Sequence, residues 1–528
     1  MSEPVVEVFA TAKWILLFVG LYLAFTVYLG FRYSERINES DDWALASRNL
    51  TLPYMVASIV ATWVCAGAIM GAAGEAYLWG FQGIIFDPWG PFLTMIIVAF
   101  FFAGRIRKLG YSTVVDFFKT RYSYKMGLLY MITQIISSLG WLGGQLVALG
   151  IIVHLTTGFS LNIAVIVGAV VLLVSTYYGG FWALSRVDAI SFALILIGLI
   201  IMFPTVMEQV GGFRYFLQFA ENWGELPTFA MLPLAGEEGY LWYTGILGIT
   251  YYLAAWASVG LGDISCPILL QRALAAKDHQ TASRGFLISS FLYLFLGMIP
   301  VMIGIAMFTW GLELSPDQAE LVLPWVAGNF LPGWAAVLFV VSIAAAIIST
   351  TGDSCLIVAA MFGHNIYQHI KPNASSQETL RVVRIATPIV TAIALCIALF
   401  FGTVYKLIIF TGAISLCTIF APYVFGFFWK KANNLGSIAS YFAGLISWVV
   451  IFFLTLPSTM EANVGILVEG EVYMEWAIWD ALYISLVPAA IISIITMVVV
   501  SLATQSIDPP KPILDAQGEF VDSKAVQG

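Results

Sequence analysis

Long apolar runs separated by short polar segments restrict the fold of this chain more than any other feature. Of its 528 residues 60% are hydrophobic and only 10% are charged, a balance typical of integral membrane proteins. A helix needs about 20 apolar residues to cross a bilayer. The sequence therefore predicts an all-α membrane protein of about 13 transmembrane helices. These lie near 11–31, 53–78, 84–103, 127–153, 161–178, 187–206, 241–270, 286–310, 333–366, 383–401, 404–429, 436–456 and 478–503.

The distribution of basic residues predicts the orientation of these helices. Cytoplasmic loops are enriched in Lys and Arg. With the N-terminus outside, 20 of the 23 bases fall in inner loops, and Arg272 is one of these 20. The three exceptions are Lys13, Arg214 and Lys406. The first apolar run lacks the basic start of a signal peptide, so we interpret it as a retained span. We expect a multi-pass protein of the cell membrane with a cytoplasmic, flexible C-terminal tail.

Five acidic residues lie inside the apolar runs, and the sequence shows no Lys or Arg at the same depth. They are Glu75, Asp87, Asp188, Asp263 and Asp353. Ionisable groups inside a membrane usually mark an ion or substrate path. Because the unpaired charges are negative, we expect the protein to move a cation.

Motifs of catalysis are missing from the sequence. It has no phosphate-binding glycine loop and no nucleotide signature, and its five cysteines follow no metal-ligand spacing. We therefore predict that the chain is not an enzyme and has no nucleic-acid partner. Uphill transport would depend on an ion gradient.

Two of the apolar runs are interrupted. Glycines weaken the run at 53–78, while Gly260, Gly262 and Pro267 break the run at 241–270. Paired breaks in two halves of a transporter point to a binding site at the middle of the membrane. The alternative is that small residues simply let helices pack closely.

Several motifs resemble the sodium:solute symporter family. AAAIISTTGDS at 344–354, followed by MFGHNIYQ at 361–368, looks like the ninth span of that family. GGFWALSRVD at 179–188 resembles the start of its sixth span. The likeness runs from about residue 20 to 445 and is nearest to the high-affinity choline transporter branch. That branch is indicated by ATWV at 61–64, GYSTVVDFF at 110–118, RYSYKMG at 121–127 and QRAL at 271–274.

The resemblance implies a five-plus-five inverted-repeat core with one preceding and two following helices. The expected parts are an N-terminal helix (1–31), a first repeat (50–210), a second repeat (240–430), two peripheral helices (435–503) and a tail (504–528). The coupling ion implied by the family is Na⁺.

Residues of the ninth span suit that ion. Ala346, Ser349 and Thr350 share one helical face, and Na⁺ is a hard cation that prefers oxygen ligands. The resemblance assigns these three residues to a sodium site completed by the carbonyls of Ala61 and Val64. The alternative is that the hydroxyls bond only to their own helix.

Asp188 and Asp353 leave two interpretations open. In family members that use two sodium ions, the sixth-span aspartate and hydroxyls of the ninth span form the second site, although Gly352 stands here where a hydroxyl is often found. Alternatively, Asp353 pairs with Arg186 or another base at the inner end.

Aromatic residues indicate the solute. Trp63 and Trp141 match tryptophans of the choline branch, and aromatic faces bind quaternary ammonium groups by cation–π attraction. Trp256 is a further candidate wall, whereas Cys266 replaces an expected seventh-span tryptophan. Asp87 and Asp263 offer charge to an amine. The alternative is that the tryptophans belong to interfacial belts.

Three functions fit these observations. The first is a sodium-coupled symporter that imports a small organic solute, such as choline or another organic cation, across the lipid bilayer. The second is a sodium symporter for an amino acid, carboxylate or sugar. The third is a membrane sensor or channel.

Overall fold

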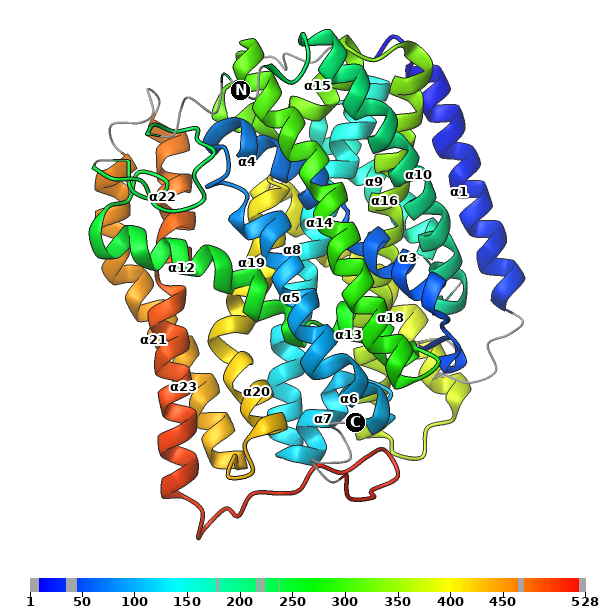
Figure 1. The fold of residues 1–528 in the computed structure, drawn as a ribbon. Helices are drawn as coiled ribbons and strands as arrows, with labels where there is room; N and C mark the ends of the chain where they lie inside the picture. The colour runs from blue at the N-terminus through cyan, green and yellow to red at the C-terminus, as the bar shows by residue number, and fades with distance from the viewer. Residues whose placement is uncertain are drawn as a thin grey trace.

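The computed structural model describes residues 9–34, 45–176, 180–214, 218, 224–236, 238–463 and 470–521. Within these residues the chain is helical and forms no β-strand, only isolated bridges. The helices run side by side in a bundle (Figure 1). The expected all-α class is therefore confirmed.

The α-helices are α1 Ala12–Ser34, α3 Leu52–Trp63, α4 Ala72–Trp79, α5 Gly90–Ile97, α6 Ala103–Leu109, α7 Val114–Arg121, α8 Tyr124–Thr157, α9 Leu161–Thr176, α10 Gly180–Gln209, α12 Gly245–Gly262, α13 Pro267–Ala275, α14 His279–Trp310, α15 Val322–Asn329, α16 Gly333–Ala360, α17 Gln368–Ile370, α18 Ser376–Phe401, α19 Tyr405–Thr418, α20 Phe420–Phe428, α21 Asn434–Asn463, α22 Gly470–Ile484 and α23 Leu486–Ala503. Shorter 3₁₀ or π segments are η1 Ala46–Arg48, η2 Gly67–Gly71, η3 Ile85–Trp89, η4 Val98–Phe102, η5 Asp263–Ser265, η6 Pro316–Leu321 and η7 Met361–Tyr367.

Membrane-spanning length is reached by many of these helices. Ten described segments are long and apolar enough to cross a bilayer, and up to 12 are if each of two bent helix pairs counts as one span. A shorter apolar helix, Leu161–Val174, lies where the fifth span was expected. The count of about thirteen stays a prediction.

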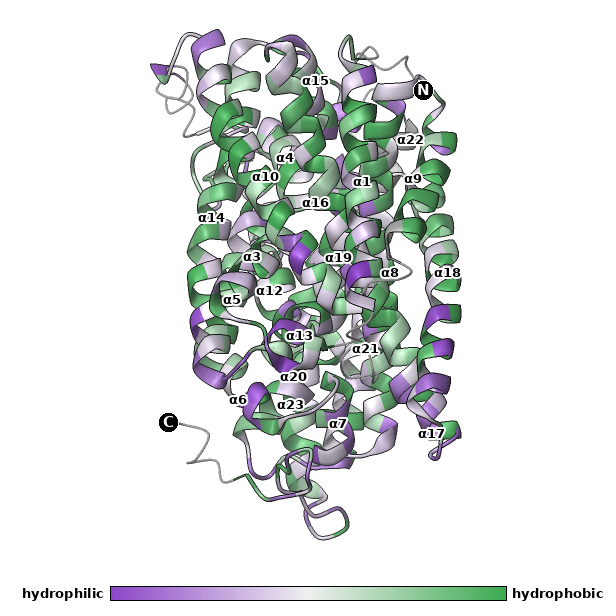
Figure 2. Cartoon of the chain, turned by 90° about the vertical axis from the view of Figure 1, so that its right-hand side faces the viewer, coloured by the Kyte–Doolittle hydropathy of each residue, from purple (hydrophilic) through white to green (hydrophobic). Residues whose placement is uncertain are grey.

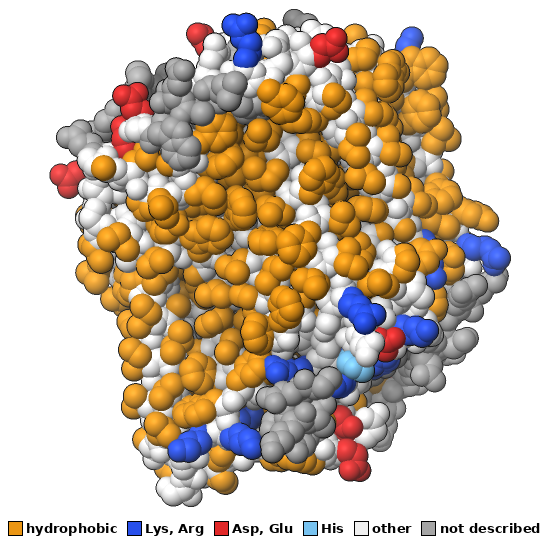
Figure 3. Space-filling view, in the orientation of Figure 1, with side chains coloured by type: hydrophobic (Ala, Val, Ile, Leu, Met, Phe, Trp, Pro, Cys, Tyr) orange, Lys and Arg blue, Asp and Glu red, His pale blue; other side chains and the backbone are white. Residues whose placement is uncertain are grey.

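Burial separates central from peripheral helices. The most apolar window is 94% buried in the Gly333–Ile370 span, which contains α16, but only 22% buried in α1. Helix α16 packs against α10, α8 and α18. Apolar side chains cover the middle of the face in Figure 3, and charged side chains gather towards its two ends. Hydrophilic residues concentrate at the end that carries α17 and the tail (Figure 2).

Both expected helix breaks are present. Helix α3 ends where Val64 leaves helical geometry, with φ −77° and ψ 70°, and the chain resumes through η2 into α4 at a bend of 58°. Helix α12 stops at Gly262, and Pro267 begins α13. A Cβ atom on Gly262 would lie 2.0 Å from the carbonyl oxygen of Gly412, so glycine is required for α12 and α19 to approach this closely.

The described part of the tail lies against the ends of α6 and α7, and its flexibility stays a prediction. Arg121 Nη1 donates to the carbonyl oxygen of Lys511 at 2.6 Å, and Lys511 Nζ donates to the carbonyl oxygen of Tyr122 at 2.6 Å. The backbone N–H of Ala516 donates to the carbonyl oxygen of Leu109 at 2.8 Å. These hydrogen bonds connect the tail to the helical bundle.

Candidate functional site

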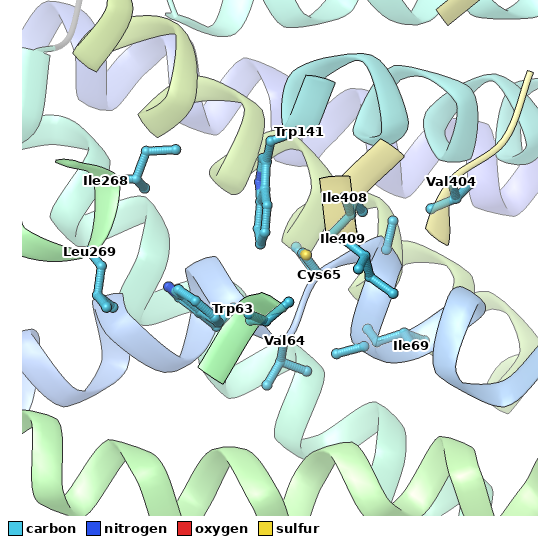
Figure 4. Packing of buried hydrophobic residues seen from close by; sticks show 14 of the residues in the cluster. Trp63, Val64, Cys65, Ile69, Trp141, Ile268, Leu269, Val404, Ile408 and Ile409 are labelled. Atoms are coloured by element: carbon cyan, nitrogen blue, oxygen red, sulfur yellow. The ribbon is translucent and has the colours of Figure 1, made fainter. Parts of the chain in front are cut away.

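Two tryptophans and a tyrosine meet beside the end of α3. The rings of Trp63 and Trp141 have centroids 5.8 Å apart, and Tyr293 of α14 lies edge-on to Trp63 at 6.2 Å. Figure 4 shows the indoles flanked by Ile268 and Leu269 on one side, with Ile408 and Ile409 towards the other. The structure therefore brings the two predicted tryptophans together.

Asp87 reaches the same group of rings. The hydroxyl of Tyr293 donates to Asp87 Oδ1, and the side chain of Asp87 is 5% exposed. Its Oδ2 faces the η2 segment, since a Cβ atom on Gly67 would lie 3.5 Å from it. We call Trp63, Asp87, Trp141 and Tyr293 the indole cluster. It combines π faces with one negative charge.

A glutamine holds the unwound segment beside this cluster. Gln145 Nε2 of α8 donates to Cys65 Sγ at 3.0 Å, and its Oε1 accepts from the backbone N–H of Ala66 at 3.3 Å. The break frees backbone groups that a continuous helix would pair internally. Gln145 thus replaces one lost helical partner and fixes the direction in which α3 ends.

Three other predicted solute residues lie on α12 and at the break that follows it. The ring centroids of Trp256 and Trp89 are 6.3 Å apart, where α12 packs against η3. Asp263 and Cys266 flank the α12–α13 break, where the Cys266 N–H donates to the Asp263 carbonyl oxygen at 2.9 Å. The Asp263 side chain is 2% exposed and has no hydrogen-bond partner within the described residues.

The predicted sodium residues lie where α16 crosses the end of α3. Thr350 Oγ1 is 3.3 Å from the Ala61 carbonyl oxygen and 3.1 Å from that of Thr62. Ala346 lies one turn before Thr350 on α16, and Val64 is the first residue past α3. The possible ligand atoms gathered here are mainly uncharged hydroxyl and carbonyl oxygens, which suit a hard monovalent cation.

Charged residues form a second cluster, about one helical turn from the sodium residues along α3 and α16. Arg272 Nη2 donates to Asp353 Oδ2 and lies 3.5 Å from Asp188 Oδ2. The same guanidinium donates to Thr62 Oγ1 at 2.7 Å and, through Nε, to Ser58 Oγ at 3.1 Å. We call Ser58, Thr62, Asp188, Arg272 and Asp353 the guanidinium cluster.

This cluster touches the sodium residues directly. Ser349, beside Thr350 on α16, donates to Asp188 Oδ1. Thr62, whose carbonyl oxygen accepts from Thr350, also donates its hydroxyl to Asp353 Oδ2 at 2.9 Å. A cation bound by the neutral oxygens would therefore interact electrostatically with both Asp188 and Asp353.

The premise that no base accompanies the buried acids is wrong. Arg272 belongs to α13, not to a loop, and its side chain is 1% exposed between the two aspartates. Of the two interpretations of Asp353, pairing with a base is present, but the base is Arg272. Arg186 instead donates to Ser185 Oγ at 2.8 Å and stacks on Trp182.

Glu75 also has a base nearby. It lines a cavity of about 60 Å³ together with Lys406 and Asp480. Tyr243 and Tyr251 each donate to Asp480 at 2.7 Å, and Lys406 Nζ lies over the Trp476 ring at 4.8 Å. Glu75 is thus removed from the indole cluster, in a mixed-charge setting of its own.

Sequence reasoning missed Arg272 and Tyr293. Arg272 comes only five residues after the break at Pro267, too soon for α13 to have left the membrane, and that spacing was a usable signal. Ser58 and Thr62 are four residues apart on α3, so both hydroxyl groups lie on one face of the helix. The sequence contains 23 tyrosines, and nothing in it distinguishes Tyr293 from the others.

Comparison with known proteins identifies the family. A high-affinity choline transporter of Caenorhabditis elegans is 26% identical over 430 residues, which cover 78% of this chain and 71% of that protein. A sodium/glucose cotransporter of Vibrio parahaemolyticus is also 26% identical, over 85% of each chain.

A solved structure of a Na⁺-coupled sialic acid symporter superposes with a TM-score of 0.71 at 18% identity, over 95% of this chain and 99% of that one. The model of the sodium:solute symporter family matches residues 43–444, most of the chain. The protein is thus a membrane transporter and not an enzyme, and it belongs to the sodium:solute symporter family.

Proposed function

We propose that this symporter couples Na⁺ to the import of a small organic cation, of which choline is the leading candidate. One observation carries the proposal: a buried carboxylate, Asp87, lies in a cluster with the indole rings of Trp63 and Trp141. Buried charges are normally paired. A cationic solute would pair with Asp87 while its apolar groups contact the rings.

The proposed sodium site consists of Ala61, Val64, Ala346, Ser349 and Thr350. The short distance from Thr350 Oγ1 to the carbonyl oxygen of Ala61 supports it, because both atoms are ligands of the type that Na⁺ needs. Since α3 ends between this site and the indole cluster, an ion that holds the end of α3 would also position Trp63. That shared segment supplies the coupling.

We further propose that a single Na⁺ is transported in each cycle. The position suggested by Asp188 and Asp353 already receives the positive charge of Arg272. A second sodium ion there would have to displace a guanidinium that donates to Ser58, Thr62 and Asp353. The activation of uptake by Na⁺ should accordingly show a Hill coefficient near one.

The two broken spans support the inverted-repeat architecture. We assign residues 50–210 and 240–430 to the two repeats, each of which begins with a helix broken near its middle, α3 with α4 and α12 with α13. We also assign the N-terminus to the outside and the tail to the cytoplasm, from the distribution of bases.

An amino acid, carboxylate or sugar is the alternative class of solute. A carboxylate would need a positive partner, whereas the indole cluster itself supplies a carboxylate, Asp87, bonded to the uncharged hydroxyl of Tyr293. Arg272, the buried base on α13 just after the second helix break, already pairs with Asp188 and Asp353. The cluster therefore favours a cation.

Counterflow in proteoliposomes tests the proposal. Vesicles with purified protein would be loaded with choline, other quaternary amines, neutral amino acids or sugars, and uptake of each labelled solute measured with and without a Na⁺ gradient. We expect uptake of one or more amines that requires Na⁺. Uptake of sugars or amino acids with no response to any amine would overturn the assignment.

A further inference from the structure

The described part of the C-terminal tail covers a large cavity at its own end of the molecule. Its volume is about 430 Å³. The walls come from α6, the end of α20 and the tail, with Arg121 of α7 at the base. We call it the tail cavity, and its lining residues are Arg105, Leu109, Arg121, Gly426, Phe427, Phe428, Trp429, Lys430, Pro510, Lys511, Pro512, Ile513, Phe520 and Val521.

Among the described residues, four bases and no acid line the tail cavity. The bases are Arg105, Arg121, Lys430 and Lys511. Within the described residues, the side chains of Arg105, Arg121 and Lys511 donate to backbone carbonyl oxygens, such as that from Arg121 Nε to Gly426 at 2.9 Å. Such bonds satisfy the donors but leave the positive charge uncompensated.

Two acidic residues of the described tail, Asp508 and Asp515, are engaged elsewhere. Asp508 accepts from the backbone N–H of Leu435 at 2.6 Å. Asp515 accepts from the backbone N–H groups of Gln517 and Glu519 at 3.0 and 2.8 Å. Asp508 therefore pairs with the start of α21, Asp515 closes a local turn, and neither lines the cavity.

The surroundings of the cavity are apolar and exposed. Phe428 and Phe520, which line it, are 46% and 66% exposed, and Phe101 lies 6.4 Å from the ring of Phe428. Arg105 lies over the Phe428 ring at 4.5 Å. Bases beside exposed aromatic rings, where a spanning helix ends, match the level at which lipid phosphates meet acyl chains.

We propose that the tail cavity binds the phosphate headgroup of an anionic phospholipid, with the acyl chains against Phe101 and Phe428. The phosphate would bridge Arg105 of α6, Lys430 after α20 and Lys511 of the tail. Because α20 is the second half of the bent α19–α20 pair, such a lipid would fasten the tail to a half-helix that continues from the central bundle. This inference is independent of the solute.

Lipid retention by the purified full-length protein tests the proposal. Native mass spectrometry would compare phosphatidylglycerol with phosphatidylcholine of the same acyl chains. We expect phosphatidylglycerol to bind more tightly, and Arg105→Gln and Lys430→Gln each to lower its affinity by about fivefold, the contribution typical of one base at an anionic surface. Equal binding of the two lipids would overturn the proposal.

Lys431→Gln is the matched control. It removes the same charge from the next residue, which does not line the cavity. We expect this variant to keep wild-type affinity. If Lys431→Gln and Lys430→Gln weaken binding equally, the attraction is a general property of this end of the protein, and the site does not exist.

Soluble glycerol phosphate distinguishes the two sources of a phosphate group. We expect it to compete with phosphatidylglycerol only at concentrations at least 100-fold higher, because it lacks the acyl chains that would contact Phe428. Competition at the concentration of the lipid would assign the cavity to a soluble phosphate compound and overturn the lipid assignment. Lys430 is exposed, so Lys430→Gln should fold even if Arg105→Gln does not.

Discussion

The guanidinium cluster and the indole cluster place buried aspartates on either side of the end of α3, but they treat the negative charge differently. Asp188 and Asp353 share Arg272 and also accept from hydroxyl groups. Among the described residues, Asp87 accepts from the hydroxyl of Tyr293, whose ring lies edge-on to Trp63. Within the described residues, one cluster contains its counter-ion, Arg272, and the other contains an uncharged partner, Tyr293.

This difference indicates which cluster takes up a cation from outside. A buried charge costs several kcal/mol unless it is paired. In the guanidinium cluster that cost is largely offset at all times, so its two carboxylates serve to hold α3, α10, α13 and α16 together. In the indole cluster the offset has to come from a ligand, which makes Asp87 sensitive to the presence of solute.

Removing Arg272 should have the largest effect of any single change. Arg272→Ala leaves two carboxylates buried within reach of each other, and breaking a buried pair in this way costs about 3–5 kcal/mol. We expect little folded protein in the membrane, measured by fluorescence-detected size exclusion and thermal melting. The double variant Arg272→Gln with Asp353→Asn should recover much of the loss, whereas no recovery would show that Arg272 acts through packing alone.

Asp87→Asn should separate folding from solute binding. Asn keeps the shape and can still accept from Tyr293, but it removes the charge that we assign to the cationic solute. Loss of one partner of a buried charge pair corresponds to roughly 100-fold weaker affinity. Direct binding of labelled solute to purified protein measures this, and unchanged melting provides the control. Wild-type affinity for an organic cation would exclude Asp87 from the solute site.

The sequence predicted the indole cluster better than the guanidinium cluster. Trp63 and Trp141 were recognisable because both match tryptophans of the choline branch, and Trp63 also adjoins the helix break. Arg272 was assigned to a loop because a base count treats every Arg as solvated, while the half-helix α13 keeps this one inside. Its partners come from α3, α10 and α16, and such distant contacts cannot be read from local spacing.

Asp188→Asn should weaken the response to Na⁺ without preventing insertion. Asn retains hydrogen bonding with Ser58 and Ser349 but lowers the negative charge beside Thr350. Two unit charges a few ångströms apart interact by a few kcal/mol at an effective dielectric constant of about 20, so we expect the Na⁺ concentration for half-maximal uptake to rise about tenfold or more. Normal Na⁺ dependence in Asp188→Asn, together with misfolding of Asp188→Ala, would show a purely structural role.

Thr350→Ala should affect Na⁺ more than it affects the guanidinium cluster. The change removes a hydroxyl that lies near two carbonyl oxygens of α3 but makes no contact with Arg272 in the described structure. We expect the half-maximal Na⁺ concentration to rise by about fivefold, as for the loss of one hydrogen-bonding oxygen. Thr351→Ala is the matched control, because Thr351 bonds only to its own helix, at Ile347 and Ile348.

Substitutions of Trp63 should give the smallest and most graded effect, and they test whether the indole cluster recognises charge or shape. A cation over an indole face gains about 0.5–2 kcal/mol, and phenylalanine keeps part of that attraction. Affinity for a cationic solute should therefore fall by about two- to threefold in Trp63→Phe and further in Trp63→Leu, which fills space but has no π face. A neutral isostere of the solute should respond to both variants equally. If the cation also binds both variants equally well, Asp87 alone recognises the charge, and the rings serve only to exclude water around it.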